Sequence, residues 1–481
     1  MTRLIDLART GGRVFSGGWR EPAGGAAAVV EPATGAVLAE VGVADADDID
    51  EAVRGAGIAQ PAWQAVPPLE RAAVLRRAAA VLTEHRDEAA EWLIRESGSI
   101  RGKAEYEVAS TVDELWAAAA LPMFPHGELL PDPAGRQSSA RRVPLGTVGV
   151  ISPWNVPLLL ALRAVAPALV LGNAVVLKPD PRTAISGGHL VAAVFERAGL
   201  PGGVLHVLAG GPKAGAALVR NLGTDMIAFT GSSAVGRQIG AEAGGALKRV
   251  SLELGGNNAL LVLDDADVEA AAAAGAWSSF FHQGQVCMAA GRHIVVESVA
   301  DRYVDALCRH AAQSTVGDPW TDDVTLGPLI DVAQRDRVDR IVRESVAAGA
   351  VLREGGGHDG LMYRPTVLTG VTPSQPAFWE EIFGPVAPVI VVADEDEAVR
   401  VANRTEYGLV ASVHTGSVSR GAALAGRLDT GIVHVNDPTI DDNAFVPFGG
   451  RGASGNGHRH GIGRNTDEFT QWQWLTLPGA G

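Results

Sequence analysis

Cys287 stands in a local sequence that could leave its thiol free to react. Residues 281–292 (FHQGQVCMAAGR) place it just after a predicted helix, among small and polar residues. A thiol becomes a good nucleophile when its pKa falls, which needs a nearby cation, helix N-terminus or base. The neighbouring sequence identifies none of these, and a lone cysteine is more often buried and inert. Cys308, within a helical pattern, is expected to be inert in that way.

Two polar residues could supply the other groups of a nucleophilic mechanism. Glu253 lies in an apolar, strand-like run followed by two glycines, and an apolar setting raises a carboxyl pKa and suits a general base. The alternative is an outward-facing position on an edge strand. Asn155 follows a predicted strand, where its amide could stabilise an oxyanion or simply form a turn. Neither residue identifies an enzyme by itself.

The composition limits the class of protein that could carry these residues. The chain has 481 residues, 47% of them hydrophobic, which is enough for two or three domains. A net charge of -15, without clustered Lys and Arg, argues against nucleic acid as a partner. The most apolar stretch, 156–177, contains Arg163 and two prolines and is a poor membrane span. With two cysteines and no apolar leader, we expect a cytoplasmic protein without a membrane partner.

Helices and strands alternate along most of the chain. Residues 46–101 have a pattern typical of helices that cover the surface of a domain. The next series has strands and helices in turn, at 146–152, 157–170, 173–178, 186–198, 204–208, 213–221 and 226–230. A second series has strands at 259–262 and 293–296 and helices at 268–281 and 300–312. This alternation predicts an α/β fold with parallel sheets covered by helices.

Seven short motifs stand in one order along the chain, and in that order they resemble the aldehyde dehydrogenase superfamily. They are Pro153-Trp154-Asn155, Lys178-Pro179, Phe229-Thr230-Gly231-Ser232, Glu253-Leu254-Gly255-Gly256, Gly284-Gln285-Val286-Cys287, Glu381-Ile382-Phe383-Gly384-Pro385 and Pro447-Phe448-Gly449-Gly450. Residues 178–183, 282–292 and 434–439 are most similar to the benzaldehyde and vanillin dehydrogenase branch. The resemblance implies two Rossmann-like parallel-sheet domains and an oligomerisation arm.

That resemblance also implies a division of the chain. Residues 1–123 and 143–252 would form the NAD(P)-binding domain, and residues 253–443 the catalytic domain carrying Cys287. Residues 124–142 and 444–481 would form the arm and tail of a homodimer or homotetramer. The expected partner is a small aldehyde, and no metal is implied.

The implied chemistry is oxidation of an aldehyde through a thioester. Cys287 would attack the aldehyde, while Asn155 and the backbone N–H of Cys287 hold the oxyanion. Hydride would pass to a nicotinamide, and water activated by Glu253 would hydrolyse the thioester. Relatives that transfer the acyl group to CoA typically lack this carboxylate, so Glu253 disfavours that rival. A non-catalytic binding protein of this fold is disfavoured because all three residues are present.

The cofactor site lacks the G-x-G-x-x-G fingerprint. The nearest candidates are Gly210-Gly211 and the run from Gly231 to Gly236, where the backbone at a helix N-terminus could receive a pyrophosphate, or merely form a turn. By resemblance, the cofactor-binding residues are Trp154, Lys178, Gly211, Gly231, Ser232, Glu381 and Phe383. Pro181 and Arg182 stand where many NAD-preferring relatives carry a Glu. NAD remains the first choice, but the missing carboxylate removes repulsion of a 2′-phosphate and leaves NADP open.

The expected substrate pocket is apolar. Val156, Leu160 and Arg163 share a face of the helix that follows Asn155, and Phe281 and Phe448 match channel-lining positions of the family. An aromatic-rimmed pocket favours an aromatic aldehyde such as benzaldehyde, with an aliphatic aldehyde or semialdehyde as the alternative. Val156 and Leu160 could instead be core residues. Arg163 could contact a polar substituent or pair with an acidic neighbour.

Overall fold

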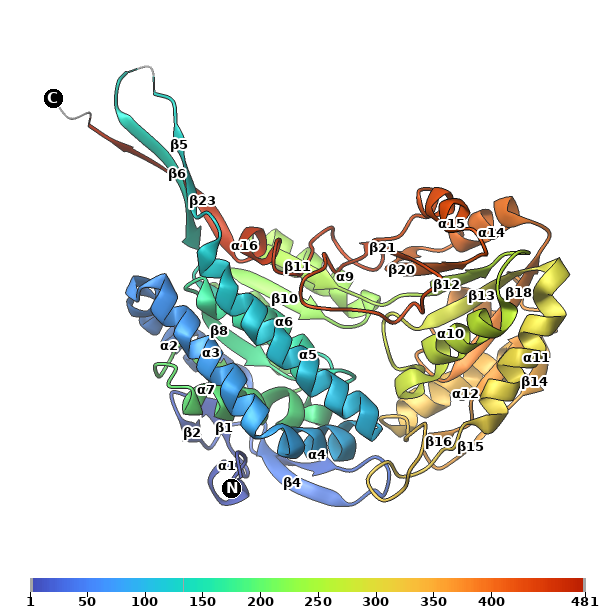
Figure 1. The fold of residues 1–481 in the computed structure, drawn as a ribbon. Helices are drawn as coiled ribbons and strands as arrows, with labels where there is room; N and C mark the ends of the chain where they lie inside the picture. The colour runs from blue at the N-terminus through green and yellow to red at the C-terminus, as the bar shows by residue number, and fades with distance from the viewer. Residues whose placement is uncertain (1–2, 133, 479–481) are drawn as a thin grey trace.

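Two seven-stranded sheets form the centres of two lobes in the computed structural model, which describes residues 3–132 and 134–478 (Figure 1). The first sheet runs in the order β11 (Arg249–Glu253), β10 (Met226–Thr230), β7 (Thr147–Ile151), β8 (Ala174–Lys178), β9 (Leu205–Val207), β1 (Val14–Ser16) and β2 (Trp19–Arg20). The strands from β11 to β9 are parallel, and β1 and β2 add antiparallel at the β9 edge.

Alternate residues of these strands enter two separate cores, because successive side chains of a strand point to opposite faces. Val175 and Leu177 of β8 pack into one core, and Val176 packs into the other. The first face is covered by α3 (Pro68–Glu84), α4 (Arg86–Ser97), α5 (Arg101–Ala120), α6 (Pro157–Val170) and α7 (Leu190–Arg197). The opposite face is covered by α2 (Ala46–Ala65), α8 (Pro212–Arg220) and α9 (Ser233–Gly245). Burial on both faces explains the continuous apolar runs of the strands.

The second sheet follows the same rule. Its order is β14 (Val351–Glu354), β17 (Thr366–Thr369), β18 (Val386–Val392), β13 (Ala290–Val296), β12 (Asn258–Val262), β20 (Val410–His414) and β21 (Ile432–Val435). One face is covered by α10 (Val268–Phe280) and α11 (Glu297–Gln313). The other is covered by α12 (Val332–Ala347), α13 (Pro376–Trp379), α14 (Glu395–Ala402) and α15 (Val418–Ala425). Only β14 is antiparallel to its neighbour in this sheet of the described chain.

A three-stranded arm projects from the first lobe (Figure 1). It consists of β5 (Gly127–Leu130), β6 (Gln137–Pro144) and β23 (Thr470–Leu477), so the two segments expected to form an arm lie side by side. The smaller elements include α1 (Leu7–Thr10), the β3 (Ala26–Val30) and β4 (Val37–Gly42) hairpin, and α16 (Asn465–Glu468). The predicted division of the chain into domains stays a prediction; β11 of the first sheet extends to Glu253.

Most elements expected from the sequence are present. The predicted helix 157–170 and strand 226–230 are confirmed with identical bounds as α6 and β10. The helix expected at 186–198 differs at its start, because Ile185–His189 forms a π-helical turn before α7. Glu96 accepts hydrogen bonds from the backbone N–H groups of Ile185 and Ser186 at this turn. This buried carboxylate satisfies donors that the first turn of a helix leaves free.

Candidate active site

Segments from both lobes meet around Cys287. The carboxyl ends of β7 and β11 point towards the loop that carries this residue, and a cavity of about 170 Å³ lies between them. Ligand sites of parallel sheets commonly lie beyond the carboxyl ends of the strands. The cavity is lined by Pro153, Trp154, Asn155, Leu160, Thr230, Gly231, Ser232, Leu254, Gly255, Cys287, Gln334, Arg337, Glu381 and Phe383.

A turn with left-handed backbone precedes Cys287. His282, Gln283 and Gly284 have φ angles of 50°, 57° and 67°, a region that costs energy for residues with a side chain. Gln283 secures the turn, since its amide donates to the backbone carbonyls of Gly98 and Pro328 at 2.8 Å each. A Cβ on Gly284 would lie 2.1 Å from the carbonyl oxygen of Gly384. The surrounding structure therefore fixes the direction from which the chain reaches Cys287.

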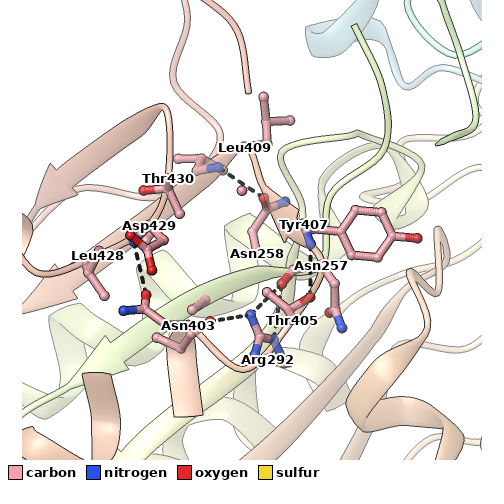
Figure 2. A pocket seen from close by; sticks show the side chains of 15 residues that line it. Asn257, Asn258, Arg292, Asn403, Thr405, Tyr407, Leu409, Leu428, Asp429 and Thr430 are labelled. Atoms are coloured by element: carbon pink, nitrogen blue, oxygen red, sulfur yellow. Dashed lines mark hydrogen bonds between the residues drawn. The ribbon is translucent and has the colours of Figure 1, made fainter. Parts of the chain in front are cut away.

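The backbone at Cys287 is held from its other side by Asn258 and Arg292. The Asn258 amide donates to the carbonyls of Cys287 and Ala289 at 2.8 Å each. Figure 2 shows Arg292 beside Asn257, whose carbonyl accepts from the guanidinium at 2.8 and 3.1 Å. Burial lowers the pKa of Arg292 to about 10, so it remains a cation at neutral pH. Arg292 therefore ties β13 to the residue before β12, two neighbouring central strands of the second sheet that adjoin the nucleophile loop.

The thiol of Cys287 is only partly exposed, and its pKa is raised rather than lowered. Burial raises the pKa of Cys287 to about 12, helped by the nearby carboxyl groups of Glu381 and Glu253, while Arg163 opposes the shift. The thiol is therefore protonated at rest near neutral pH. The lowered pKa that a nucleophilic cysteine was expected to need is not a property of this resting site, because burial disfavours the thiolate and carboxyl groups outnumber cations around the sulfur.

Glu253 ends β11 as a buried carboxyl, 4% exposed. Neither of its oxygens has a hydrogen-bond partner among the residues that the structure describes. Burial raises the pKa of Glu253 well above its ordinary value, although Arg163 and Arg459 favour the ionised form. This position excludes the outward-facing alternative considered from the sequence. A buried acceptor without a partner is costly, so it calls for an explanation.

Asn155 is buried beside the same loop. Its side-chain amide donates to the carbonyl of Gln285 at 2.9 Å, two residues before Cys287. The amide group of Asn155, the thiol of Cys287 and the backbone after Glu253 thus line one cavity. Glu253 itself is not among the described residues that line this cavity, but its carboxyl is near enough to help raise the pKa of the Cys287 thiol, so the three expected residues come together from separate parts of the chain.

Several expected cofactor residues share this cavity: Trp154, Gly231, Ser232, Glu381 and Phe383. The ring centroids of Trp154 and Phe383 lie 5.5 Å apart in an edge-to-face contact. Ser232 caps the N-terminus of α9. Burial raises the pKa of Glu381 to about 7, and this carboxyl accepts a hydrogen bond from the backbone N–H of Gly256 at 2.9 Å.

Lys178 and Gly211 lie along the neighbouring strand ends. The Lys178 ammonium donates to the carbonyl of Gly210 at 2.9 Å, and Gly211 stands at the N-cap of α8. Both residues therefore lie on the carboxyl-end side of the first sheet, as Gly231 and Ser232 do. Neither residue is among the described residues that line the Cys287 cavity.

The expected substrate residues fall into two groups, those near the cavity and those away from it. Leu160 lines the cavity, and Phe281 and Phe448 belong with Cys287 to one apolar cluster. Val156, at the N-cap of α6, is not one of the described residues that line it. Arg163 is ion-paired with Glu114 and Asp442, which is the second of its two alternatives.

Comparison with known proteins decides between the enzyme classes that such a site could serve. A model described as the aldehyde dehydrogenase family matches residues 19–475. The chain belongs to the aldehyde dehydrogenase family. It is 54% identical to a vanillin dehydrogenase of Amycolatopsis sp., covering 99% of this chain and 98% of that one. It is 50% identical to a benzaldehyde dehydrogenase [NAD(+)] of Pseudomonas putida, covering 97% of this chain and 96% of that one.

Solved structures agree with the fold of this aldehyde dehydrogenase. An E. coli enzyme described as NADP dependent matches with a TM-score of 0.94 at 32% identity, covering 99% of this chain and all of that chain. A betaine aldehyde dehydrogenase from Staphylococcus aureus in complex with NAD+ matches with a TM-score of 0.95 at 27% identity, covering 99% and 96%. The predicted family and α/β fold with parallel sheets are confirmed.

Sequence reasoning missed two buried residues of this aldehyde dehydrogenase, Lys103 and Glu107. The Lys103 ammonium donates to a Glu107 oxygen at 2.5 Å and to the backbone carbonyl of Asn155 at 2.8 Å. The other oxygen of Glu107 accepts from Leu158 N–H at 2.8 Å, at the start of α6. This pair fixes the junction between Asn155 and α6. An i,i+4 Lys–Glu pair normally indicates an exposed helix face, so the pattern alone was misleading.

Neither a metal centre nor a membrane-crossing helix is found where the structure describes the chain. Over residues 3–132 and 134–478, no group of three or more His, Cys, Asp or Glu side chains is arranged to hold a metal ion. Within the same residues, no helix has the length and apolar character required to cross a membrane.

Proposed function

We propose that this chain oxidises an aromatic aldehyde of the benzaldehyde type to its carboxylic acid, with NAD as the electron acceptor. The observation that carries the proposal is Glu253, a buried carboxyl near Cys287 that has no hydrogen-bond partner among the described residues. Its similarity to a vanillin dehydrogenase and a benzaldehyde dehydrogenase over nearly the whole chain supports the substrate class. Hydrolysis of a thioester gives this carboxyl a use that a binding protein would lack.

Cys287 is the nucleophile. Its sulfur attacks the aldehyde carbon, and the thiol proton passes to water in the cavity as the S–C bond forms, which leaves the aldehyde oxygen of the thiohemiacetal as an oxyanion. The Asn155 amide and the backbone N–H of Cys287 stabilise the oxyanion that develops on the aldehyde oxygen. The left-handed turn before Cys287 and the bond from Asn155 to Gln285 hold these groups in one arrangement before substrate arrives. Loss of hydride leaves an acyl group bound to sulfur as a thioester.

Glu253 acts in the second half of the reaction. Both oxygens of Glu253 lack a donor among the described residues, so each can accept a hydrogen bond from a water that reaches it. With its raised pKa, the ionised carboxyl is a stronger base than an exposed glutamate, and it removes a proton from the water that attacks the thioester. Release of the acid regenerates the thiol. Transfer to CoA would need no such base.

The residues around the cavity fit a nicotinamide cofactor, which supplies a hydride acceptor when bound. Glu381 has a buried carboxyl at the cavity wall that can accept hydrogen bonds from ribose hydroxyls, and Phe383 can position the ring. Gly231 and Ser232, at the start of α9, offer backbone N–H donors to the pyrophosphate. Trp154, Lys178 and Gly211 complete the groove, with Lys178 placed for the adenosine ribose.

NAD is favoured over NADP by the charges next to Lys178. Arg182 could in principle receive a 2′-phosphate, but its guanidinium donates to Asp180 at 2.9 Å and to Asp331 at 2.7 Å. Although burial opposes ionisation, Arg182 lowers the pKa of Asp180, so this carboxylate stays charged. A 2′-phosphate would have to displace or repel these carboxylates. The NAD(+) in the name of the Pseudomonas putida relative supports the same choice.

The apolar walls around Cys287 support an aromatic substrate. Leu160, Phe281 and Phe448 flank the nucleophile, and Phe281 stacks on Trp277 with 4.3 Å between ring centroids. A ring entering this space would be enclosed by apolar and aromatic surface. Val156, set back from the cavity, would contribute only to the support of Asn155.

The assembly, domain roles and location belong to the same proposal. The first lobe serves as the NAD-binding domain, and the second carries Cys287. The arm exposes Leu129 at 81% and Trp474 at 68%, which are apolar side chains suited to cover by a second copy in a homodimer or homotetramer. Both cysteines are free thiols, in agreement with a reducing cytoplasm.

The test is reduced-cofactor absorbance after benzaldehyde is added to enzyme and NAD, with no CoA present. Cys287→Ala should abolish turnover, whereas the matched variant Cys308→Ala should retain it because Cys308 lies on α11, partly buried against the core, and does not line the cavity. A panel of aromatic and aliphatic aldehydes with NAD and NADP defines the substrate and cofactor preferences. Unchanged turnover by Cys287→Ala, or a strict requirement for CoA, would contradict the proposal.

A further inference from the structure

Arg163 is a buried cation held between two carboxylates. It lies on α6 and is 4% exposed. Its Nε donates to Glu114 at 3.0 Å, and Nη2 is paired with Asp442 in the loop after β21. The guanidinium also lies 4.8 Å from the centre of the Phe448 ring. Burial opposes the charge, but Asp442 and Glu114 together raise the pKa of Arg163, so it is permanently charged.

This cluster lies at the far end of the space next to Cys287. Leu160, one helical turn before Arg163, lines the Cys287 cavity. A second small cavity is lined by Leu160, Thr230 and Arg163, so the two spaces share Leu160 and Thr230. Arg163 lines the second cavity and not the first, so an aldehyde with its carbonyl at Cys287 would have to extend past Leu160 to approach Arg163 and its partners.

Around Arg163, the positive charge does not exceed the negative charge. One guanidinium faces the two carboxylates of Glu114 and Asp442, and Glu253 is close enough to be influenced by both Arg163 and Asp442. Asp442 also has one buried oxygen, Oδ1, without a hydrogen-bond partner among the described residues. A substrate carboxylate arriving here would meet this oxygen rather than a free guanidinium. Like charges brought together in a partly desolvated site repel strongly.

Asp442, unlike Glu114, is a partner of Arg163 whose charge also acts on the Cys287 thiol, although it is not among the described residues that line the cavity. Glu114 reaches Arg163 from α5, within the helical layer, whereas Asp442 comes from the same loop region as Phe448. Tyr106 fixes that loop by donating to the backbone carbonyl of Asp442 at 3.0 Å. Removing the Asp442 charge would uncover a guanidinium that is well suited to bind a carboxylate.

We propose that Asp442 is a specificity-determining residue, which masks the charge of Arg163 so that the site selects uncharged aldehydes over aldehydes that carry a carboxylate. The proposal rests on the proposed function in one respect, the placement of the aldehyde carbonyl at Cys287. The substrate property that Asp442 would control is the charge at the end remote from the aldehyde group. The apolar walls alone do not determine this preference.

A matched pair of substrates tests the wild-type enzyme directly. Methyl 4-formylbenzoate and 4-carboxybenzaldehyde have the same ring and aldehyde but differ in charge. We expect kcat/KM for the carboxylate to be lower by about tenfold or more, because one unfavourable charge contact in such a site is worth at least that. Equal values for the two compounds would overturn the proposal without any variant.

The variant Asp442→Asn tests the residue assignment. It should raise kcat/KM for 4-carboxybenzaldehyde relative to the ester by about tenfold, chiefly through a lower KM, because Arg163 gains a free donor. The double variant Arg163→Met/Asp442→Asn should lose that gain. Asp441→Asn, which neutralises the exposed neighbouring carboxylate, is the matched control and should leave the ratio unchanged. A folded Asp442→Asn enzyme with the wild-type ratio would overturn the proposal.

An aliphatic pair separates this inference from the substrate class. If benzaldehyde and the ester are both poor substrates, the aromatic proposal fails, and the same comparison is made with succinic semialdehyde and its methyl ester. Preference for the ester, reversed by Asp442→Asn, supports the role of Asp442 whatever the preferred aldehyde is. Preference for the acid in the wild-type enzyme would overturn it.

Discussion

Glu107 and Glu253 are both buried carboxyl groups near Asn155 or Cys287, but their surroundings differ. Glu107, 0% exposed, accepts from Lys103 and from the backbone N–H groups of Leu158 and Leu159. Glu253, 4% exposed, has no protein donor in the described chain. The Glu107 carboxyl links α5 to α6, whereas the oxygens of Glu253 have no donor in the described chain.

This difference distinguishes a carboxyl that stabilises the fold from a carboxyl that is available for catalysis. A buried carboxylate with all of its acceptors occupied stabilises one arrangement of the backbone, here the start of α6 after Asn155. A buried carboxyl with no partner carries a desolvation cost that stability alone does not explain. At Glu253 this cost preserves a base whose oxygens are free for water. We expect changes at Glu107 and Lys103 to affect folding first, and changes at Glu253 to affect turnover first.

The largest expected effect on turnover comes from Glu253→Gln. Loss of a general base should lower kcat by about 10²- to 10⁴-fold. The melting temperature should stay the same or rise, because an ionisable group without a partner has been removed from the interior. Steady-state kinetics and thermal unfolding of the same preparation measure both. A melting temperature that drops together with kcat would assign Glu253 a structural role instead.

Lys103→Met should reverse this pattern by destabilising the fold. It leaves Glu107 buried without its cation, which should cost about 3–5 kcal/mol in the free energy of unfolding. Denaturant titration provides the measurement. Lys213→Met, at an exposed lysine on α8, is the matched control and should change stability by less than about 0.5 kcal/mol. A stability loss no greater than that of the control would mean that the Lys103–Glu107 pair is not needed for folding.

The pH dependence of kcat should report the ionisation of Glu253. Its pKa is raised, so the carboxyl keeps its proton to a higher pH than an ordinary glutamate. The base form, and kcat with it, should increase about tenfold per pH unit below that pKa and level off above it. The Glu253→Gln enzyme should lack this rise. A wild-type profile that is already flat from weakly acidic pH upward would argue against a raised pKa.

A smaller effect is expected in cofactor binding through Glu381. Its pKa of about 7 means that the carboxylate, the better acceptor for ribose hydroxyls, forms as the pH rises through neutrality. KM for NAD should therefore fall by about threefold to tenfold between about pH 6 and about pH 8, since hydrogen bonds to charged groups are worth about 1.5–3 kcal/mol. Glu381→Gln should remove the pH dependence. A wild-type KM that does not change over this range would contradict a role for this carboxylate.

The sequence predicted the central fold because buried parallel strands are continuous apolar runs, and the ends of α6 and β8 are marked by proline. Glu253 at the end of a strand, and Asn155 and Cys287 in loops between elements, could be recognised because each stands within a motif. The protonated resting thiol was not predictable, because the carboxyl groups that raise its pKa come from distant segments.

The supporting residues escaped prediction for a related reason. Lys103 and Glu107 have the spacing of an exposed ion pair, and only the packing of α5 against α6 buries them. Asp441 and Asp442 are adjacent acids in a loop, and the position of Arg163 decides which one turns inward. Local sequence patterns report periodicity and turn chemistry, but they do not report which long-range neighbour neutralises a charge.

The most direct test of the account is the first turnover of Glu253→Gln. Rapid mixing with NAD and benzaldehyde should give a burst of reduced cofactor close to one equivalent per active site, followed by near-complete arrest, because thioester formation precedes the step that needs the base. The wild-type enzyme should continue to turn over. Absence of the burst, or steady turnover at the wild-type rate, would contradict the assignment of Glu253 to thioester hydrolysis.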